Sequence, residues 1–260
     1  MRVVDLDRDM SDVIPTGATR DSQFLFDRMT AETLALAEPG PGRRLLDVAS
    51  GFGQDAVALA RRGAQVVALE PSARMTNWAR LVGEKEPGAV PRWVRGWSDS
   101  LPFASQRFDG VICKGAIDHF DRPEHAIAEM ARVTRPGGRV VLAIANFESL
   151  ACRLARLADA LELHGAPRRG RRHYDVPADH FTRYDLDLMR EQAARWLDLE
   201  VVRGISLGWG VPLWARAVGR VPGVLARRAL QALDAGARRI PAWADVVVLA
   251  GRPRRTQTSR

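Results

Sequence analysis

The stretch "LLDVASGFGQDAVALA", residues 45–60, joins a short apolar run to a helical pattern through a turn of small residues. The apolar run predicts a buried strand over 44–49, and the pattern after the turn predicts a helix over 54–62. The same alternation continues along the chain, with strands expected at 65–70, 92–95, 108–114 and 139–145 and helices at 72–82 and 123–133. Strands that alternate with helices predict a mostly parallel sheet covered on both faces.

The rhythm changes after Asn146. An arginine-rich helix and a polar loop are expected over 147–183, and Asp185 has the position of an N-cap for the next helix. A strand at 199–207, a broken helical stretch at 212–238 and a last strand at 244–252 follow. We therefore expect an antiparallel pair at the end of the sheet and a helical lid. The predicted organisation is a helical arm at 1–38, one domain at 39–252 with lid insertions near 147–183 and 210–240, and a disordered basic tail at 253–260.

The composition limits the class of protein and its location in the cell. With 260 residues, 46% of them hydrophobic and 27% charged, the chain is that of a globular α/β protein. No apolar run approaches the roughly 20 residues that span a bilayer, and the start "MRVVDLDRDMSDVIP" is too acidic for a signal peptide. We expect a cytoplasmic protein without a membrane span. Cys113 and Cys152 are too few for a disulfide framework or a thiolate zinc site, and no metal is expected.

The net charge of +8 raises the question of nucleic acid. Lys85 and Lys114 are the only lysines among 39 basic residues, and the arginines are scattered over most of the chain. The arginines cluster only at 168–172 and in the tail 251–260, which could meet phosphates or acidic lipid headgroups. We interpret both as solvated segments, so nucleic acid is not the expected partner.

The turn at 47–53, "DVASGFG", occupies the place where a parallel α/β sheet binds its ligand, at the carboxyl end of the first strand. Its small residues let a ligand approach the backbone closely. Two ligands compete for it. "GFGQDA" fits the dinucleotide pattern G-x-G-x-x-A, with Glu70 as the ribose acceptor. Asp47, however, would repel a pyrophosphate, whereas it suits a ligand that carries an ammonium and a sulfonium.

Four segments in order resemble the class I S-adenosylmethionine (SAM)-dependent methyltransferases, in particular the methyltransferase type 11 group. They are "LLDVASGFG", "VVALEPSARM", "GWSDSLPFASQRFDGVICKGAIDHF" and "EMARVTRPGGRVVLAIAN". The resemblance covers about residues 40–146 well and 176–252 loosely. It implies SAM as the cofactor and a doubly wound, mostly parallel seven-stranded sheet, the Rossmann-like methyltransferase fold, with an inserted helical lid.

The resemblance also implies cofactor contacts. Asp47 would hold the methionine amine, Glu70 both ribose hydroxyls, and Lys114 the cofactor carboxylate through its backbone or its ammonium. The backbone of the loop would lie under the cofactor at Ala49, Ser50, Gly51 and Gly53. Pro71 and Met75 would pack on the adenine.

The sequence departs from the family pattern at two places. Ala49 stands where the family has its first glycine, which should narrow the loop slightly. In "GWSD", Trp97 stands where the family has an acid that binds the adenine amine, and Ser98 and Asp99 follow it. Either the Trp97 indole packs against adenine or Asp99 accepts the amine from two residues on.

Methyl transfer from a sulfonium is an in-line displacement, so a base is needed only when the acceptor must lose a proton. His119 after the fourth strand and His180 in the lid are the candidate catalytic bases, and a packing or capping role is the alternative for each; His173 and Tyr174 lie near His180 in the lid. Trp209, Trp214 and Trp243 either line an apolar acceptor pocket or bury the lid helices.

The expected function is transfer of a methyl group from SAM to a small-molecule acceptor, with O-methylation slightly favoured. "CKGA" stands where nucleobase and some protein methyltransferases carry Asn-Pro-Pro-Tyr, which argues against those acceptors. The alternatives are an RNA or protein methyltransferase that uses the arginine clusters and a SAM-binding module without catalysis. The expected oligomeric state is a monomer or a homodimer.

Overall fold

The computed structural model describes residues 19–84, 88, 90–161, 174–177, 180–211 and 213–254. Predictions for 1–18, for the arginine cluster 168–172 and His173 and for the tail beyond 254 lie outside these residues. Within them, no helix is long and apolar enough to cross a membrane.

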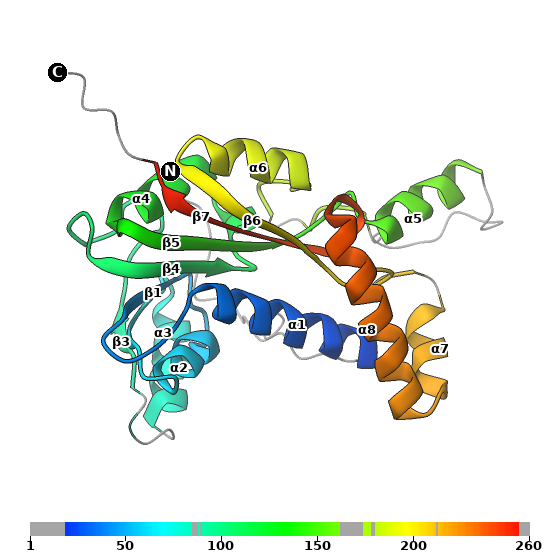
Figure 1. Cartoon of the computed structure of the whole chain (residues 1–260), viewed down its shortest axis with the longest axis horizontal. Helices are drawn as coiled ribbons and strands as arrows, with labels where there is room; N and C mark the ends of the chain where they lie inside the picture. The colour runs from blue at the N-terminus through cyan, green and yellow to red at the C-terminus, as the bar shows by residue number, and fades with distance from the viewer. Residues whose placement is uncertain are drawn as a thin grey trace.

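A seven-stranded sheet forms the centre of the molecule, as the sequence predicted (Figure 1). Its strands lie in the order β3-β2-β1-β4-β5-β7-β6. The first five run parallel, and β7 is antiparallel to both of its neighbours, β5 and β6. The strands are β1 Arg44–Val48, β2 Gln65–Leu69, β3 Arg92–Val94, β4 Phe108–Lys114, β5 Thr134–Ala145, β6 Leu197–Ile205 and β7 Val246–Pro253.

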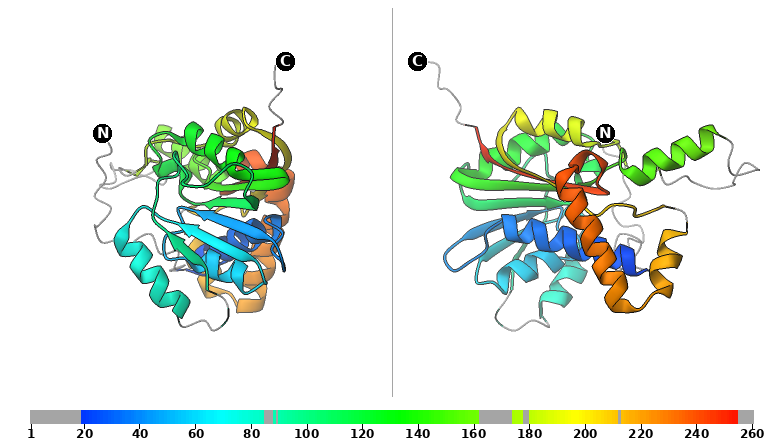
Figure 2. Two further views of the ribbon diagram at one scale, coloured as in Figure 1. Left: turned by 90° about the vertical axis from the view of Figure 1, so that its left-hand side faces the viewer. Right: turned by 45° about the vertical axis from the view of Figure 1, so that its right-hand side comes forward.

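Helices cover both faces of the sheet (Figure 2). Helices α4 (Pro123–Val133) and α6 (Leu186–Ala194) pack on one face. Helices α1 (Arg20–Leu36) and α2 (Gln54–Ala60) pack on the other face, where α3 (Ala73–Glu84) lies beside α2. The alternation of side chains along each strand divides the core accordingly. In β4, for example, Val111 and Cys113 belong to the first layer, whereas Ile112 belongs to the second.

Strand β5 begins earlier than its sequence indicates. The "RPGG" segment predicted a turn before a strand at 139–145, but β5 starts at Thr134. Phe108 pairs with Thr134 and Gly110 with Arg139, so the four residues 135–138 bulge out between two paired positions. The turn is present as a bulge inside the strand, with Gly137 at a φ of 82°.

The lid contains three helices: α5 (Leu150–Ala160), α7 (Trp214–Arg220) and α8 (Gly223–Arg239). Figure 1 shows α5 projecting beyond the end of the sheet. Asp185 caps α6 as predicted, because its Oδ1 accepts the Leu188 N–H at 2.8 Å. Trp214 packs with Val218 of α7 and Leu230 of α8, so this tryptophan serves the packing of the lid helices.

The turn between β1 and α2 has an unusual backbone. Ala49, Gly51 and Gly53 have φ values of 57°, 52° and 74°, all in the left-handed region. Glycine enters this region without cost, whereas an L-residue pays about 1–2 kcal/mol because its Cβ crowds the following carbonyl. Ala49 therefore places strain in the loop where the ligand is expected.

We predict that Ala49→Gly raises the free energy of unfolding by about 0.5–1 kcal/mol, because relief of the left-handed strain exceeds the added entropy of the unfolded chain. Urea denaturation of both proteins measures the difference. Ala58→Gly, inside α2, is the matched control and should be destabilising by about 1 kcal/mol. An Ala49→Gly protein that is less stable than the parent would contradict the strain at this position.

Candidate functional site

The loop after β1 is fixed by the end of β2. The Ser50 N–H donates to the Leu69 carbonyl at 3.0 Å, and the Gly51 N–H donates to Glu70 Oε2 at 3.0 Å. The other oxygen, Oε1, accepts the Ser72 N–H at 3.0 Å. One carboxylate thus ties the loop to the segment that opens α3. Because each oxygen has two acceptor positions, Glu70 can still receive a hydroxyl at each oxygen.

Gly53 of the loop has no room for a side chain, and Gly51 lies in van der Waals reach of α3. A Cβ at Gly53 would overlap the Trp93 ring and lie 3.1 Å from Ala79 Cβ, and a Cβ at Gly51 would lie 3.4 Å from Met75 Cε. The loop backbone therefore lies directly against α3 and β3.

Asp47 is buried at the end of β1. Loss of solvent raises the pKa of its carboxyl well above 3.8; Asp55 and Glu70 raise this pKa further, while Lys114 lowers it. Asp47 Oδ2 and Ser50 Oγ are buried polar atoms with no hydrogen-bond partner among the described residues. Such atoms are costly unless something binds them. The loop therefore fits a ligand that brings a cationic donor to Asp47 and hydroxyls to Glu70, as the amine and ribose of SAM do.

Lys114 ends β4 and points toward α2. Its ammonium donates to Thr30 Oγ1 at 2.7 Å and lies 2.8 Å from Asp55 Oδ2. The side chain is thus already bound by two partners. A backbone contact from this residue to the cofactor, one of the two expected forms, remains a prediction.

The residues expected around the adenine differ in their burial and in their polar contacts. Asp99 Oδ2 accepts from Arg122 at 2.5 Å, so its carboxylate is engaged in an ion pair with the residue that precedes α4. Trp97 has 38% of its surface exposed and Ser98 is half-buried. Pro71 is half-buried and Met75 buried beside the glycine loop. Both alternatives for the adenine, packing on Trp97 and acceptance of its amine by Asp99, stay predictions.

His119 and His180 meet at the carboxyl end of β4. His119 closes the short 3₁₀ helix Ile117–His119, and the two ring centroids lie 4.3 Å apart at an interplanar angle of 68°. The sequence predicted both histidines but not their contact. It also missed Asp118, which is buried beside them, with Oδ2 2.9 Å from His180 Nδ1. Asp118 directly precedes His119 in "AIDHF". This neighbourhood indicates a site only once the fold brings His180 against it.

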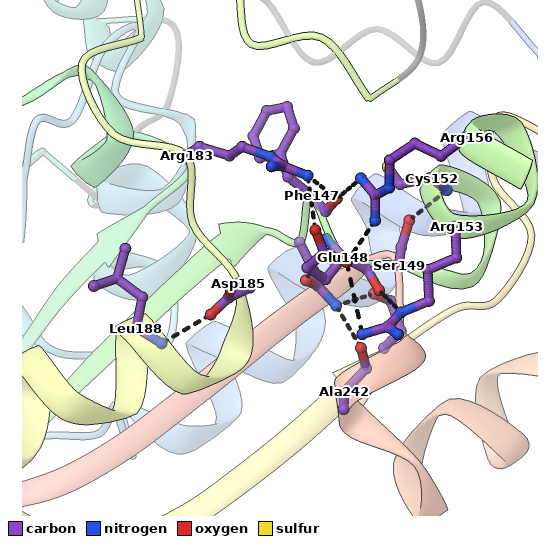
Figure 3. A network of polar contacts seen from close by, with 12 residues as sticks. Phe147, Glu148, Ser149, Cys152, Arg153, Arg156, Arg183, Asp185, Leu188 and Ala242 are labelled. Carbon is purple, nitrogen blue, oxygen red and sulfur yellow. Dashed lines mark hydrogen bonds and ion pairs between the residues drawn. The ribbon is translucent and has the colours of Figure 1, made fainter. Parts of the chain in front are cut away.

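The segment that carries His180 is held in place from two sides. The N–H groups of Phe181 and Thr182 donate to the Asp118 carbonyl at 2.7 and 3.2 Å. Glu148, at the base of α5, lies 2.7 Å from Arg183 and 2.5 Å from Arg156 (Figure 3). The described part of the lid therefore folds over the end of β4.

Asp245 is a second acid that the sequence did not indicate. It precedes β7, and burial raises the pKa of its carboxyl to about 7, although the N–H groups of Trp209 and Gly208 and the side chain of Ser206 act in the opposite direction. Its Oδ2 accepts the Trp209 N–H at 3.0 Å. The carboxyl thus shapes the loop after β6, and nothing in "PAWADVVV" distinguishes it from an ordinary turn residue.

Comparison with known proteins agrees with the geometry. Residues 46–142 match the family model described as a methyltransferase domain. The match begins inside β1 and ends in β5, so it contains the glycine loop, Glu70 and the end of β4.

Curated relatives resemble the same half of the chain. The demethylmenaquinone methyltransferase of Renibacterium salmoninarum is 35% identical over 133 residues, which are 51% of this chain and 51% of the relative. A protein of the same name from Mycobacterium sp. is 40% identical over 115 residues, 43% of this chain and 45% of the relative. The chain spans about half the length of these curated relatives.

Solved structures share the whole architecture at low identity. A putative methyltransferase in complex with the Trm112 methyltransferase activator, from Haloferax volcanii, is 20% identical, with a TM-score of 0.61 and coverage of 92% of this chain and 94% of that chain. Magnesium protoporphyrin IX methyltransferase from Synechocystis is 15% identical, with a TM-score of 0.58 and coverage of 90% and 86%. Residues 46–142 are thus similar to the methyltransferase domain family, and the sheet that contains them has the Rossmann-like methyltransferase fold of these solved structures.

Proposed function

We propose that the protein transfers the methyl group of SAM to a small-molecule acceptor. The observation that carries the proposal is the pairing of two acids around one glycine loop: Asp47 with an unpartnered buried oxygen among the described residues, and Glu70 bound to the loop backbone. A dinucleotide pyrophosphate beside Asp47 would bring two negative groups together in a buried place, whereas an ammonium would balance the charge.

Each residue of the proposed site would bind a different part of SAM. SAM supplies an electrophilic methyl group on a sulfonium. Asp47 would hold the amine, Glu70 the ribose, and Trp97 and Met75 the adenine, while the close backbone at Gly51 and Gly53 shapes the floor. These contacts fix the position of the methyl group, and positioning is the main contribution of an enzyme to an in-line displacement.

The acceptor is proposed to be small, and oxygen is slightly favoured as the methylated atom. The names of two curated relatives support a small acceptor, because they name demethylmenaquinone. Support for oxygen comes from His119 and His180, which lie at the carboxyl end of β4, next to β1 in the sheet. A hydroxyl acceptor must lose its proton, and an imidazole at this edge would accept that proton.

The proposal is tested with methyl-labelled SAM and separate acceptor pools: reduced demethylmenaquinone, hydroxylated aromatic compounds, RNA and protein. Label transfer to a small molecule is the expected result. Transfer confined to RNA or protein, or binding of SAM without transfer to any pool, would refute the proposal and support one of the two alternative functions.

We predict that Glu70→Ala weakens SAM binding by about 1.5–3 kcal/mol, because charge-assisted hydrogen bonds to the ribose are lost. Isothermal titration calorimetry measures the change. Glu84→Ala, an exposed acid at the end of α3, is the matched control and should bind SAM as the parent does. An unchanged dissociation constant in Glu70→Ala would remove this residue from the cofactor site.

Asp47→Asn should change binding and stability in opposite directions. SAM affinity should fall about tenfold or more, since the amine loses its counter-charge. Stability at neutral pH should rise, because the folded protein no longer buries a poorly solvated carboxylate. The pKa of this carboxyl is raised on folding, so parent stability relative to the variant should decrease as pH rises from 3.8 through the raised pKa. Thermal unfolding of both proteins across this pH range measures the difference, and a less stable variant at neutral pH would contradict it.

His119→Ala should lower turnover by about 10²–10⁴-fold and leave SAM affinity nearly unchanged, if this imidazole acts on a hydroxyl acceptor. His125→Ala, an exposed histidine of α4, is the matched control. Steady-state kinetics normalised to folded protein separates the two roles. Full activity per folded molecule together with a lower unfolding temperature would show that His119 only packs.

A further inference from the structure

Three side chains with metal-binding atoms meet where β4 ends. Asp118 and His119 come from the 3₁₀ helix Ile117–His119, and His180 comes from the lid segment that folds back over it. One carboxylate oxygen and one ring nitrogen from each histidine all lie within 4.8 Å of one another. The site is sheltered, because the side chains of Asp118 and His180 are only 4% and 15% exposed.

The contact between Asp118 and His180 is short but is not a hydrogen bond. His180 Nδ1 lies 2.9 Å from Asp118 Oδ2, yet this nitrogen and Asp118 Oδ1 are buried atoms without a hydrogen-bond partner among the described residues. At this distance a well-directed N–H would bond the carboxylate. The nitrogen therefore does not point at Oδ2, and the cluster keeps two buried atoms, His180 Nδ1 and Asp118 Oδ1, that a ligand could bind. A buried carboxylate without such a bond is costly, so a cation bound there would stabilise it.

The spacing suits one ion. Ligand atoms at about 2.1 Å from a single ion lie roughly 3.0 Å apart at an angle of 90° and roughly 3.4 Å apart at the tetrahedral angle. Asp118 Oδ2 and His180 Nδ1, 2.9 Å apart, already have a separation near the shorter value. His119 Nε2 lies 3.9 Å from the other carboxylate oxygen, Oδ1, so a small movement of the half-exposed His119 ring completes the set.

We propose that Asp118, His119 and His180 bind one divalent transition-metal ion. Two imidazole nitrogens and one carboxylate are a ligand set used for Zn²⁺, Fe²⁺ and related ions, and three protein ligands leave coordination positions open. The sequence predicted no metal, because the three residues become a set only through the fold.

The ion's place suggests its use. Strand β4 pairs with β1, so the three ligands lie at the same edge of the sheet as the glycine loop. An open position on an ion there would bind the acceptor oxygen and lower the pKa of its hydroxyl. The proton would leave to solvent, the oxygen would form its bond to the methyl carbon, and the sulfur would keep the electron pair of the broken bond. In this use His119 and His180 hold the ion and do not themselves accept the proton, so ligation takes the place of the base role in the proposed function. The use of the ion rests on the proposed function, whereas the metal site itself does not.

The test is metal binding by the whole, tag-free chain. After treatment with a chelator, the protein is titrated with Co²⁺ and with Zn²⁺ by calorimetry, and the Co²⁺ absorption spectrum reports the geometry. We expect one ion per chain. Asp118→Asn, His119→Ala and His180→Ala should each weaken binding about tenfold or more and change the Co²⁺ spectrum.

Two controls make the result decisive. His125→Ala removes an exposed histidine of α4 and should bind the ion as the parent does. Asp118→Asn keeps the side-chain shape and the backbone carbonyl that binds Phe181 and Thr182, so circular dichroism should show an intact fold. SAM binding, measured in parallel, reports the cofactor site independently of the ion. Absence of a stoichiometric ion in the parent, or equal affinity in all three variants, would overturn the proposal and leave Asp118 and His180 as an ion pair.

Discussion

The hydrogen bond from the Gly51 N–H to the Glu70 carboxylate is the contact on which the candidate site depends. It joins the loop after β1 to the end of β2, and the Ser50 N–H to Leu69 contact reinforces it. A parallel sheet brings these strand ends to one edge, but it does not fix the loop between them. The carboxylate does so, and the left-handed residues of the loop then direct the backbone against α3.

The same edge of the sheet concentrates groups that are unfavourable without a ligand. Asp47 is a desolvated carboxylate, Ala49 has a left-handed backbone, and Asp118 is buried beside a histidine that it does not bond. Two buried acids of α1 and α8 are, in contrast, well paired: Glu32 meets Arg28 and Arg203, and Asp234 meets Arg28. Unfavourable local arrangements are common where binding can compensate for them, and the presence of these three at one edge agrees with the site that the glycine loop indicates.

Local patterns and family motifs together predicted much of this structure. Alternating apolar runs predicted the strands and helices within a few residues, and the antiparallel end of the sheet followed from the changed rhythm after Asn146. The predicted start of β5 was wrong, because the residues of a Pro-Gly-Gly turn also suit a bulge inside a strand. The cluster of Asp118, His119 and His180 depends on a contact between segments about 60 residues apart, and the pKa of Asp245 depends on its burial. Neither is visible in local sequence.

The most direct measurement of the central claim is a crystal structure with the demethylated cofactor S-adenosylhomocysteine bound. We expect both ribose hydroxyls on the Glu70 carboxylate, the amine at Asp47, and the adenine against Met75 and Trp97. The sulfur should face the edge of the sheet where His119 and His180 meet. A cofactor bound away from the 47–53 loop, or with its ribose remote from Glu70, would show that Glu70 and the glycine loop do not form the cofactor site.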